Sequence, residues 1–215
     1  MKREINIDEI SENNLYDDND MVRIGCNDCA GCSECCRFSS DTIILDPSDI
    51  YRLEKGLNMG FTELCGKYLN LRMVDGLTLP YLLVDEGSGC RLLSPEGRCT
   101  IHEFRPGNCR LFPLGRIYEN GDFRYFIQKD QCVSPLRIKV KVSSWLGIEN
   151  LKGYRRFLNS WHDLLKKERE NLAGAEIEKQ KSTMLALLQT FYVNPYDTER
   201  DFYEQFEERL SLIKN

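Results

Sequence analysis

The chain has 215 residues, of which 41% are hydrophobic, so it can bury one sizeable core without relying on a metal ion. A formal net charge of −5 and a pI near 5.3 argue against a sequence-independent binder of nucleic acid, which needs a basic face to displace counterions. No stretch approaches the roughly 18 apolar residues of a membrane span, and the acidic residues 1–21 contain no signal-peptide pattern. We therefore expect a cytoplasmic protein without a nucleic-acid or membrane partner.

Residues 1–21 are dominated by Asp, Glu and Asn, and we expect them to form an acidic mobile tail. The next segment, residues 22–136, contains all ten cysteines and is predicted to be a cysteine-cluster domain that binds metal. A disulfide framework is the alternative for an even number of cysteines, but such frameworks are typical of short secreted chains. In a reducing cytoplasm, clustered thiols bind metal ions or iron–sulfur clusters instead.

Five of the ten cysteines lie in the eleven-residue run CNDCAGCSECC, which begins at Cys26. Gaps of two residues allow one loop to present several sulfurs to the same site. Counted from the first cysteine, the run has the spacing of a bacterial ferredoxin loop, whose ligands here are Cys26, Cys29, Cys32 and Cys36. Counted from Cys29, the run is CxxCxxCC, and further ligands must come from Cys90, Cys99, Cys109 and Cys132. We favour the second interpretation, because it explains why the chain has the later cysteines.

The chain between the two cysteine-rich segments predicts short strands and helices. Residues 42–45 are apolar and suit a buried strand, and residues 77–84 suit another. Asp46 has the position of a helix cap before Pro47, with Gly56 as the expected end of that helix. A second helix is expected over residues 61–69 and would carry Cys65.

The remaining chain predicts a hairpin followed by helices. The Asn120-Gly121 pair predicts a tight hairpin turn, because both residues tolerate positive φ. Residues 137–215 contain no cysteine, and their apolar residues recur at helical spacing. We expect one long helix that starts at Ser143 or Ser144 and ends before Gly174, followed by helices over residues 177–192 and 198–213. The predicted fold class is therefore α+β, with a cysteine-rich region of short strands, loops and helices backed by C-terminal helices.

Two motifs carry a resemblance to a known family. CAGCSECC begins at Cys29, CTIHEFRPGNCRLFP begins at Cys99, and GCRLL lies between them. Together they resemble the CxxCxxCC, or YkgJ-type, family of zinc- or iron-chelating proteins over residues 25–135, with His102 in place of the family's tyrosine. The resemblance implies that the metal or iron–sulfur ligands are Cys29, Cys32, Cys35, Cys36, Cys90, Cys99 and Cys109, with Cys132 as a further member.

Other residues near the cysteines have predicted roles. Arg105 belongs to the family's second motif and Arg110 follows a predicted ligand, so we expect both guanidinium groups to bind near the cofactor and offset the charge of several thiolates. The alternative is that they are solvated on loops. His102 is able to ligate zinc, but the family's tyrosine favours a ring that packs beside the site. Cys65 lies outside both motifs and is expected not to bind metal.

Some relatives with this cysteine signature are flagellin lysine N-methylases, so the resemblance also implies an enzyme hypothesis with S-adenosylmethionine as the cofactor. Residues 82–90 look like the glycine turn of a nucleotide-type methyltransferase. However, Arg91 stands where a third glycine belongs, and no βαβ unit surrounds the stretch. We expect instead that Gly87 and Gly89 allow the backbone to approach Cys90.

Three functions are therefore consistent with the sequence. We favour a metal-binding protein that holds an iron–sulfur cluster such as [4Fe–4S], ahead of zinc. The first alternative is an enzyme similar to the flagellin lysine N-methylases. The second is a structural zinc module that docks a protein partner.

Overall fold

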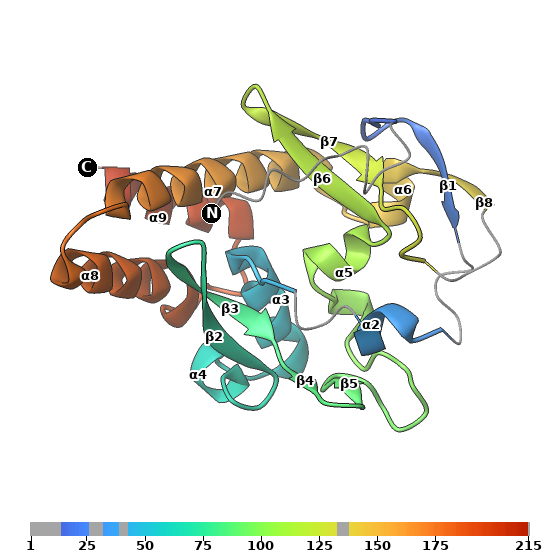
Figure 1. Cartoon of the computed structure of the whole chain (residues 1–215), viewed down its shortest axis with the longest axis horizontal. Coiled ribbons are helices and arrows are strands. Elements are labelled where there is room, and N and C mark those ends of the chain that lie inside the picture. Colours follow the sequence, from blue (N-terminus) through green and yellow to red (C-terminus); the bar gives the residue numbers. More distant parts are fainter. Residues whose placement is uncertain (1–13, 26–31, 39–42, 133–137, 215) are drawn as a thin grey trace.

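The computed structural model describes residues 14–25, 32–38, 43–132 and 138–214, and it has a mixed α+β fold (Figure 1). In these ranges the strands form four separate antiparallel pairs. The pairs are β1 (Met21–Gly25) with β8 (Ile138–Lys141), β2 (Leu69–Val74) with β3 (Leu77–Leu82), β4 (Val84–Asp85) with β5 (Gly89–Cys90), and β6 (Leu114–Glu119) with β7 (Asp122–Ile127). The predicted α+β class is confirmed.

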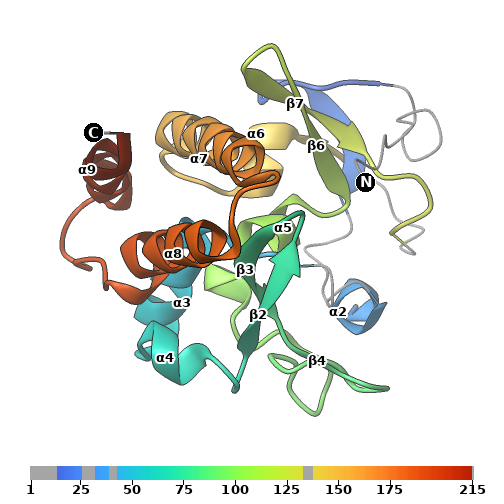
Figure 2. The same ribbon diagram turned by 60° about the vertical axis from the view of Figure 1, so that its left-hand side comes forward.

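Short helices alternate with these strands, and longer ones follow them. The short helices are α2 (Glu34–Phe38), α3 (Pro47–Leu57), α4 (Phe61–Leu64), the 3-10 helix η3 (His102–Phe104) and α5 (Gly107–Leu111). The C-terminal region contains α6 (Val142–Leu146), α7 (Leu151–Leu172), α8 (Ile177–Leu188), the π-helical turn η4 (Gln189–Val193) and α9 (Phe202–Lys214). Figure 2 shows α7 between α9 and the β6–β7 hairpin. Among the described residues, no helix is both long enough and apolar enough to cross a membrane.

The C-terminal helices support the cysteine-rich part of the chain through a shared hydrophobic core. Tyr192 of η4 is buried, its ring lies 5.9 Å from that of Phe61, and its hydroxyl donates a hydrogen bond to the Leu45 carbonyl at 3.1 Å. On the other side of α3, the rings of Tyr51 and Phe202 lie 5.3 Å apart. These contacts hold α3 in place, and α3 in turn positions part of the cysteine site.

The predicted start of α3 is confirmed. The Asp46 carboxylate accepts a hydrogen bond from the Asp49 backbone N–H at 2.9 Å, and the Asp49 carboxylate accepts one from the Asp46 N–H at 3.1 Å. The helix continues past Gly56 and ends at Leu57. Residue 56 is glycine for a packing reason, because a Cβ there would overlap the Phe104 ring.

Two other predicted helices have different bounds. The helix expected over residues 61–69 ends at Leu64, because the chain then turns at Gly66, which has a φ of +78°, before β2 begins at Leu69. The first long C-terminal helix begins at Leu151 instead of near Ser143, and Asn150 caps it by accepting a hydrogen bond from the Gly153 N–H at 2.9 Å. The hairpin turn at residues 120–121 is confirmed, with φ of 54° and 78° between β6 and β7.

Residues 1–13 of the predicted acidic tail lie outside the described residues. Residues that follow them pack on β7, where Tyr16 and Tyr125 exchange backbone hydrogen bonds of 2.8 and 2.9 Å. The Asp18 carboxylate accepts a hydrogen bond from the Tyr125 hydroxyl at 3.0 Å and pairs with Arg155 of α7 at 3.2 Å. These contacts join residues 14–20 to both β7 and α7.

Candidate metal centre

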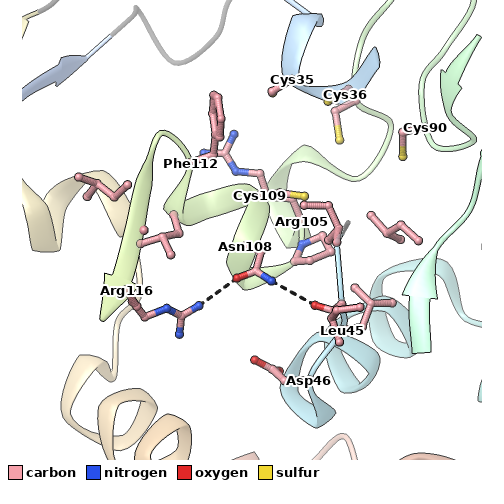
Figure 3. Close-up of a pocket in the computed structure, with 18 of the residues that line it drawn as sticks. Cys35, Cys36, Leu45, Asp46, Cys90, Arg105, Asn108, Cys109, Phe112 and Arg116 are labelled. Carbon is pink, nitrogen blue, oxygen red and sulfur yellow. Dashed lines mark hydrogen bonds between the residues drawn. The ribbon is translucent and has the colours of Figure 1, made fainter. Parts of the chain in front are cut away.

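Cysteines from well-separated segments line one cavity of about 900 Å³ (Figure 3). The six that line it are Cys32, Cys35, Cys36, Cys90, Cys99 and Cys109. Figure 3 shows the sulfurs of Cys36, Cys90 and Cys109 pointing into the space between α2, β5 and α5. Cys29 and Cys26 lie outside the described residues. The two cysteine-rich segments of the sequence thus meet at one place in the fold.

β5 approaches α2 closely because residue 89 is glycine. Gly89 has a φ of +85°, and a Cβ there would lie 2.8 Å from both the Arg37 Cα and the Cys36 carbonyl oxygen. A side chain at this position would push Cys90 away from the α2 cysteines. Residues 82–90 contain the β4–β5 hairpin, not the strand and helix of a βαβ unit. The expected close backbone approach is confirmed for Gly89 and is not seen for Gly87, whose Cβ position has no atom of the described residues within 4 Å.

Gly89→Ala is therefore expected to lower metal content and to destabilise the protein by about 1–3 kcal/mol, because it adds a steric clash to the strain of positive φ. Gly87→Ala is the matched control. Gly87 also has a positive φ, of +75°, but no atom of the described residues lies within 4 Å of its Cβ position. The metal-to-protein ratio and the thermal unfolding midpoint of both variants check this. Equal metal content in the two variants would contradict the role assigned to Gly89.

Cys109 is positioned by a contact with α3. The buried Asp49 carboxylate accepts a hydrogen bond of 2.6 Å from the backbone N–H of Gly107, the first residue of α5. Next to it, the Asn108 side-chain amide donates to the Ile44 carbonyl at 3.2 Å. Figure 3 shows the bond of the Asn108 side chain. The two bonds fix the start of α5, and with it Cys109, against α3 and the segment that leads into it.

The surroundings of the thiols favour their neutral form when no cation is bound. Burial raises the pKa of Cys90 and of Cys99. Burial, and then the nearby Asp49 carboxylate, raise the pKa of Cys109. A hydrogen bond with the Cys36 side chain, and then burial, raise the pKa of Cys35. Because soft metals bind the thiolate form, a bound cation has to supply the charge that makes ionisation favourable.

Arg105 lines the cavity and opposes these shifts. Its positive charge acts to lower the pKa of Cys35 and of Cys99, against the larger effect of burial on Cys99 and of the Cys36 hydrogen bond on Cys35. Its Nη1 lies 3.1 and 3.3 Å from the two ring nitrogens of His102. His102 also lines the cavity, so its ring packs beside Arg105 at the edge of the thiol cluster.

Arg110 is placed differently from Arg105 and does not line the cavity. Its guanidinium donates to the carbonyls of Arg105 at 3.2 Å and Gly147 at 3.4 Å, and also to that of Glu103. Burial, and then its arginine neighbours, lower the pKa of Arg110 to about 10. The structure therefore gives Arg110 contacts that hold the η3 segment against the turn after α6.

Two described cysteines lie away from the cavity lining. Cys132 is half-buried after β7, and its neighbour Gln131 lines the cavity while Cys132 does not. Cys65 ends α4 and packs against the hydrophobic core, where burial raises its pKa.

The sulfurs share a cavity but are not gathered around a single point. In the ranges that the structure describes, no three Cys, His, Asp or Glu side chains are grouped closely enough to hold one metal ion. Sulfurs bonded to one zinc ion at about 2.3 Å lie about 4 Å from each other. Binding of a single ion by these residues would therefore require their sulfurs to move closer together.

Polar and aromatic side chains line the other end of the cavity, and they could not be recognised as one group from the sequence. These residues are Asp46, Asn108, Arg116, Tyr118, Trp145, Trp161 and His162. The rings of His162 and Tyr118 stack 3.8 Å apart and are inclined by only 3°. Of these residues, only Asp46 could be given a role from its neighbours in the sequence, as a helix cap. The others come together only when β6 packs on α7.

A comparison with protein families finds a match to the cysteine-rich part of the chain. Residues 28–133 match the model of the CxxCxxCC family, described as "Putative zinc- or iron-chelating domain". The matched segment contains every cysteine that lines the cavity, together with Cys29 and Cys132. A comparison with curated proteins and one with solved structures find no match.

Proposed function

Because the chain belongs to the CxxCxxCC family through residues 28–133, and so carries a zinc- or iron-chelating domain, we propose that it holds an iron–sulfur cluster, in preference to a single zinc ion. The ligands come from the loop of residues 29–36 and from Cys90, Cys99 and Cys109. The observation that supports this proposal is the spacing of the thiols among the described residues, which line one cavity yet are not grouped closely enough for one ion. Each cysteine of a [4Fe–4S] cluster binds a different iron, so its sulfurs lie farther apart than those of one zinc ion.

The donor set also supports a soft metal. The cavity lining contains six cysteines and two histidines, and one of the histidines, His102, lies close to Arg105. Thiolates select zinc, copper(I) or iron–sulfur clusters. Arg105 offsets part of the negative charge that several thiolates carry, which is one way a protein tunes a cluster. Arg110 acts indirectly in this proposal, since its hydrogen bonds fix the carbonyl of Arg105. A cluster bound here would supply one-electron chemistry.

Anaerobic purification followed by metal and acid-labile sulfide analysis tests the proposal. We expect iron and inorganic sulfide in equal amounts, with the visible absorbance of a cluster. Zinc without sulfide would contradict the cluster and leave the zinc-chelating alternative, in which the site is a structural module for docking a partner. Iron without sulfide would also contradict it.

The methyltransferase alternative requires S-adenosylmethionine to bind beside the thiols. A cavity of about 900 Å³ is large enough for such a cofactor, and this observation keeps the alternative in view. Calorimetric titration of the metal-replete protein with S-adenosylmethionine separates the two functions. Absence of binding would reject the methyltransferase, and saturable binding would favour it over a module that only holds metal.

A further inference from the structure

The cavity is much larger than the thiol cluster needs. Its volume of about 900 Å³ lies within the range of roughly 300–1,000 Å³ that is usual for small-molecule sites. The cysteines occupy the end near α2 and β5, whereas the opposite end is formed by β3, β6 and α7. The apolar walls at this opposite end include Leu79, Leu114, Leu158, Trp161 and Leu165. A metal centre held by the thiols therefore leaves room for an organic molecule beside it.

Arg116 of β6 brings a positive charge to this second end of the cavity. Its Nη2 donates to the Asn108 side-chain oxygen at 3.2 Å, but its Nη1 is buried and has no hydrogen-bond partner among the described residues. The rings of Phe123 and Tyr154 lie 5.8 and 6.0 Å from the guanidinium carbon and compensate only part of the charge. A buried guanidinium without a carboxylate partner is unfavourable, so this position favours an anion.

Asp46 is the acidic side chain among the described residues that line the same cavity; its charge and that of Arg116 attract each other, but the two groups form no ion pair within 4 Å. One oxygen of its carboxylate accepts hydrogen bonds from the Ser48 hydroxyl at 2.8 Å and from the Asp49 backbone N–H at 2.9 Å. Burial raises the pKa of Asp46, whereas the hydrogen bonds from Ser48 and Asp49 and the charge of Arg116 act to lower it. Tyr118 and His162 are further titratable groups at this end; burial raises the pKa of Tyr118 and lowers that of His162, which favours the neutral form of both.

We propose that the end of the cavity between β6 and α7 binds a small organic carboxylate with an apolar or aromatic body. The carboxylate pairs with the guanidinium of Arg116, whose planar fork suits two parallel hydrogen bonds. The apolar body packs against Leu158, Trp161 and Leu165. This site shares its cavity with the thiols, but the proposal stands whether those thiols hold iron or zinc.

The tryptophans of the chain offer a direct test. Trp145 and Trp161 are the only two tryptophans in the sequence, and both line the cavity. Titration of the full chain with 3-phenylpropanoate, monitored by tryptophan emission, is expected to show saturable binding. Its neutral amide, 3-phenylpropanamide, has the same shape without the charge and should bind at least about tenfold more weakly, since hydrogen bonds to charged groups are the stronger ones. Equal binding of the two compounds, or no saturable change with either, would overturn the proposal.

Arg116→Gln identifies the group that binds the anion. This variant should lose the preference for the acid over the amide while its metal content stays unchanged. The matched control is Arg124→Gln on β7, which removes the same charge from an exposed side chain and should keep the preference. If the preference persists in Arg116→Gln, another cation such as Arg105 or the metal binds the carboxylate, and the proposal fails. If Arg116→Gln does not fold, Leu165→Phe replaces it. The larger side chain should narrow the site and weaken the binding of both 3-phenylpropanoate and 3-phenylpropanamide. Unchanged affinities would overturn the proposal that the ligand lies at this end of the cavity.

Discussion

Replacing Cys109 by serine is expected to lower the metal affinity of the protein by at least about tenfold. A serine hydroxyl is a poor ligand for the soft metals that thiolates hold, and even outer-shell changes at metal sites cost about 10–100-fold. Because metal binding is coupled to folding, the thermal unfolding midpoint should fall together with the metal content. Metal and sulfide analysis, combined with thermal unfolding of the same samples, measures both effects.

Cys65→Ser is the matched control for this experiment. Cys65 is also a half-buried cysteine whose pKa is raised by burial, but it ends α4 and does not line the cavity. We expect its replacement to leave metal content unchanged. Equal metal loss in the two variants would show that the cavity does not define the ligand set, and full metal content in Cys109→Ser would exclude Cys109 as a ligand.

Asp49→Ala is expected to destabilise the protein by about 2–4 kcal/mol and to reduce its metal content. The change removes half of the capping box of α3, which is worth about 0.5–2 kcal/mol, and leaves the buried Gly107 N–H without its acceptor, which costs about 1–3 kcal/mol. Loss of that acceptor frees the start of α5 and so displaces Cys109. Denaturant unfolding and metal analysis of the purified variant check both parts.

Asp201→Ala is the control that separates the loss of a helix cap from the loss of the acceptor for the Gly107 N–H. The Asp201 carboxylate accepts a hydrogen bond from the Glu204 N–H at 3.0 Å at the exposed start of α9, far from the thiols in sequence and outside the cavity lining. Its loss should cost only about 1 kcal/mol and leave the metal in place. Should Asp49→Ala retain full metal content despite a lower stability, the proposed link between α3 and Cys109 would be wrong.

Local signals explain which features could be predicted from the sequence. The Asp46 cap, the Asn120-Gly121 turn and the ligand types in the CxxCxxCC run each depend on residues that are neighbours in the chain. The helix expected over residues 61–69 was wrong in its second half, where Gly66 adopts a φ of +78° and turns the chain toward β2. The glycine was a local signal for this turn, but the pairing of residues 69–74 with β3 is not visible in the sequence.

The remaining features depend on contacts between distant residues. The sequence indicates a helix start at Asp46, but the bond of Asp49 to Gly107 crosses 58 positions of sequence and sets the place of Cys109. Arg110 adjoins a cysteine, yet adjacency did not reveal that its guanidinium turns toward backbone carbonyls. The second end of the cavity was not predicted at all, because Arg116 and His162 belong to elements that meet only in the folded protein.

Anomalous diffraction at the metal absorption edge, from crystals of the metal-replete protein, will show whether both cysteine-rich segments contribute to one metal centre. We predict one centre bonded to sulfurs of the residue 29–36 loop and also to sulfurs among Cys90, Cys99 and Cys109. A centre bonded only within the first loop, by the ferredoxin-type set Cys26, Cys29, Cys32 and Cys36, would contradict the claim.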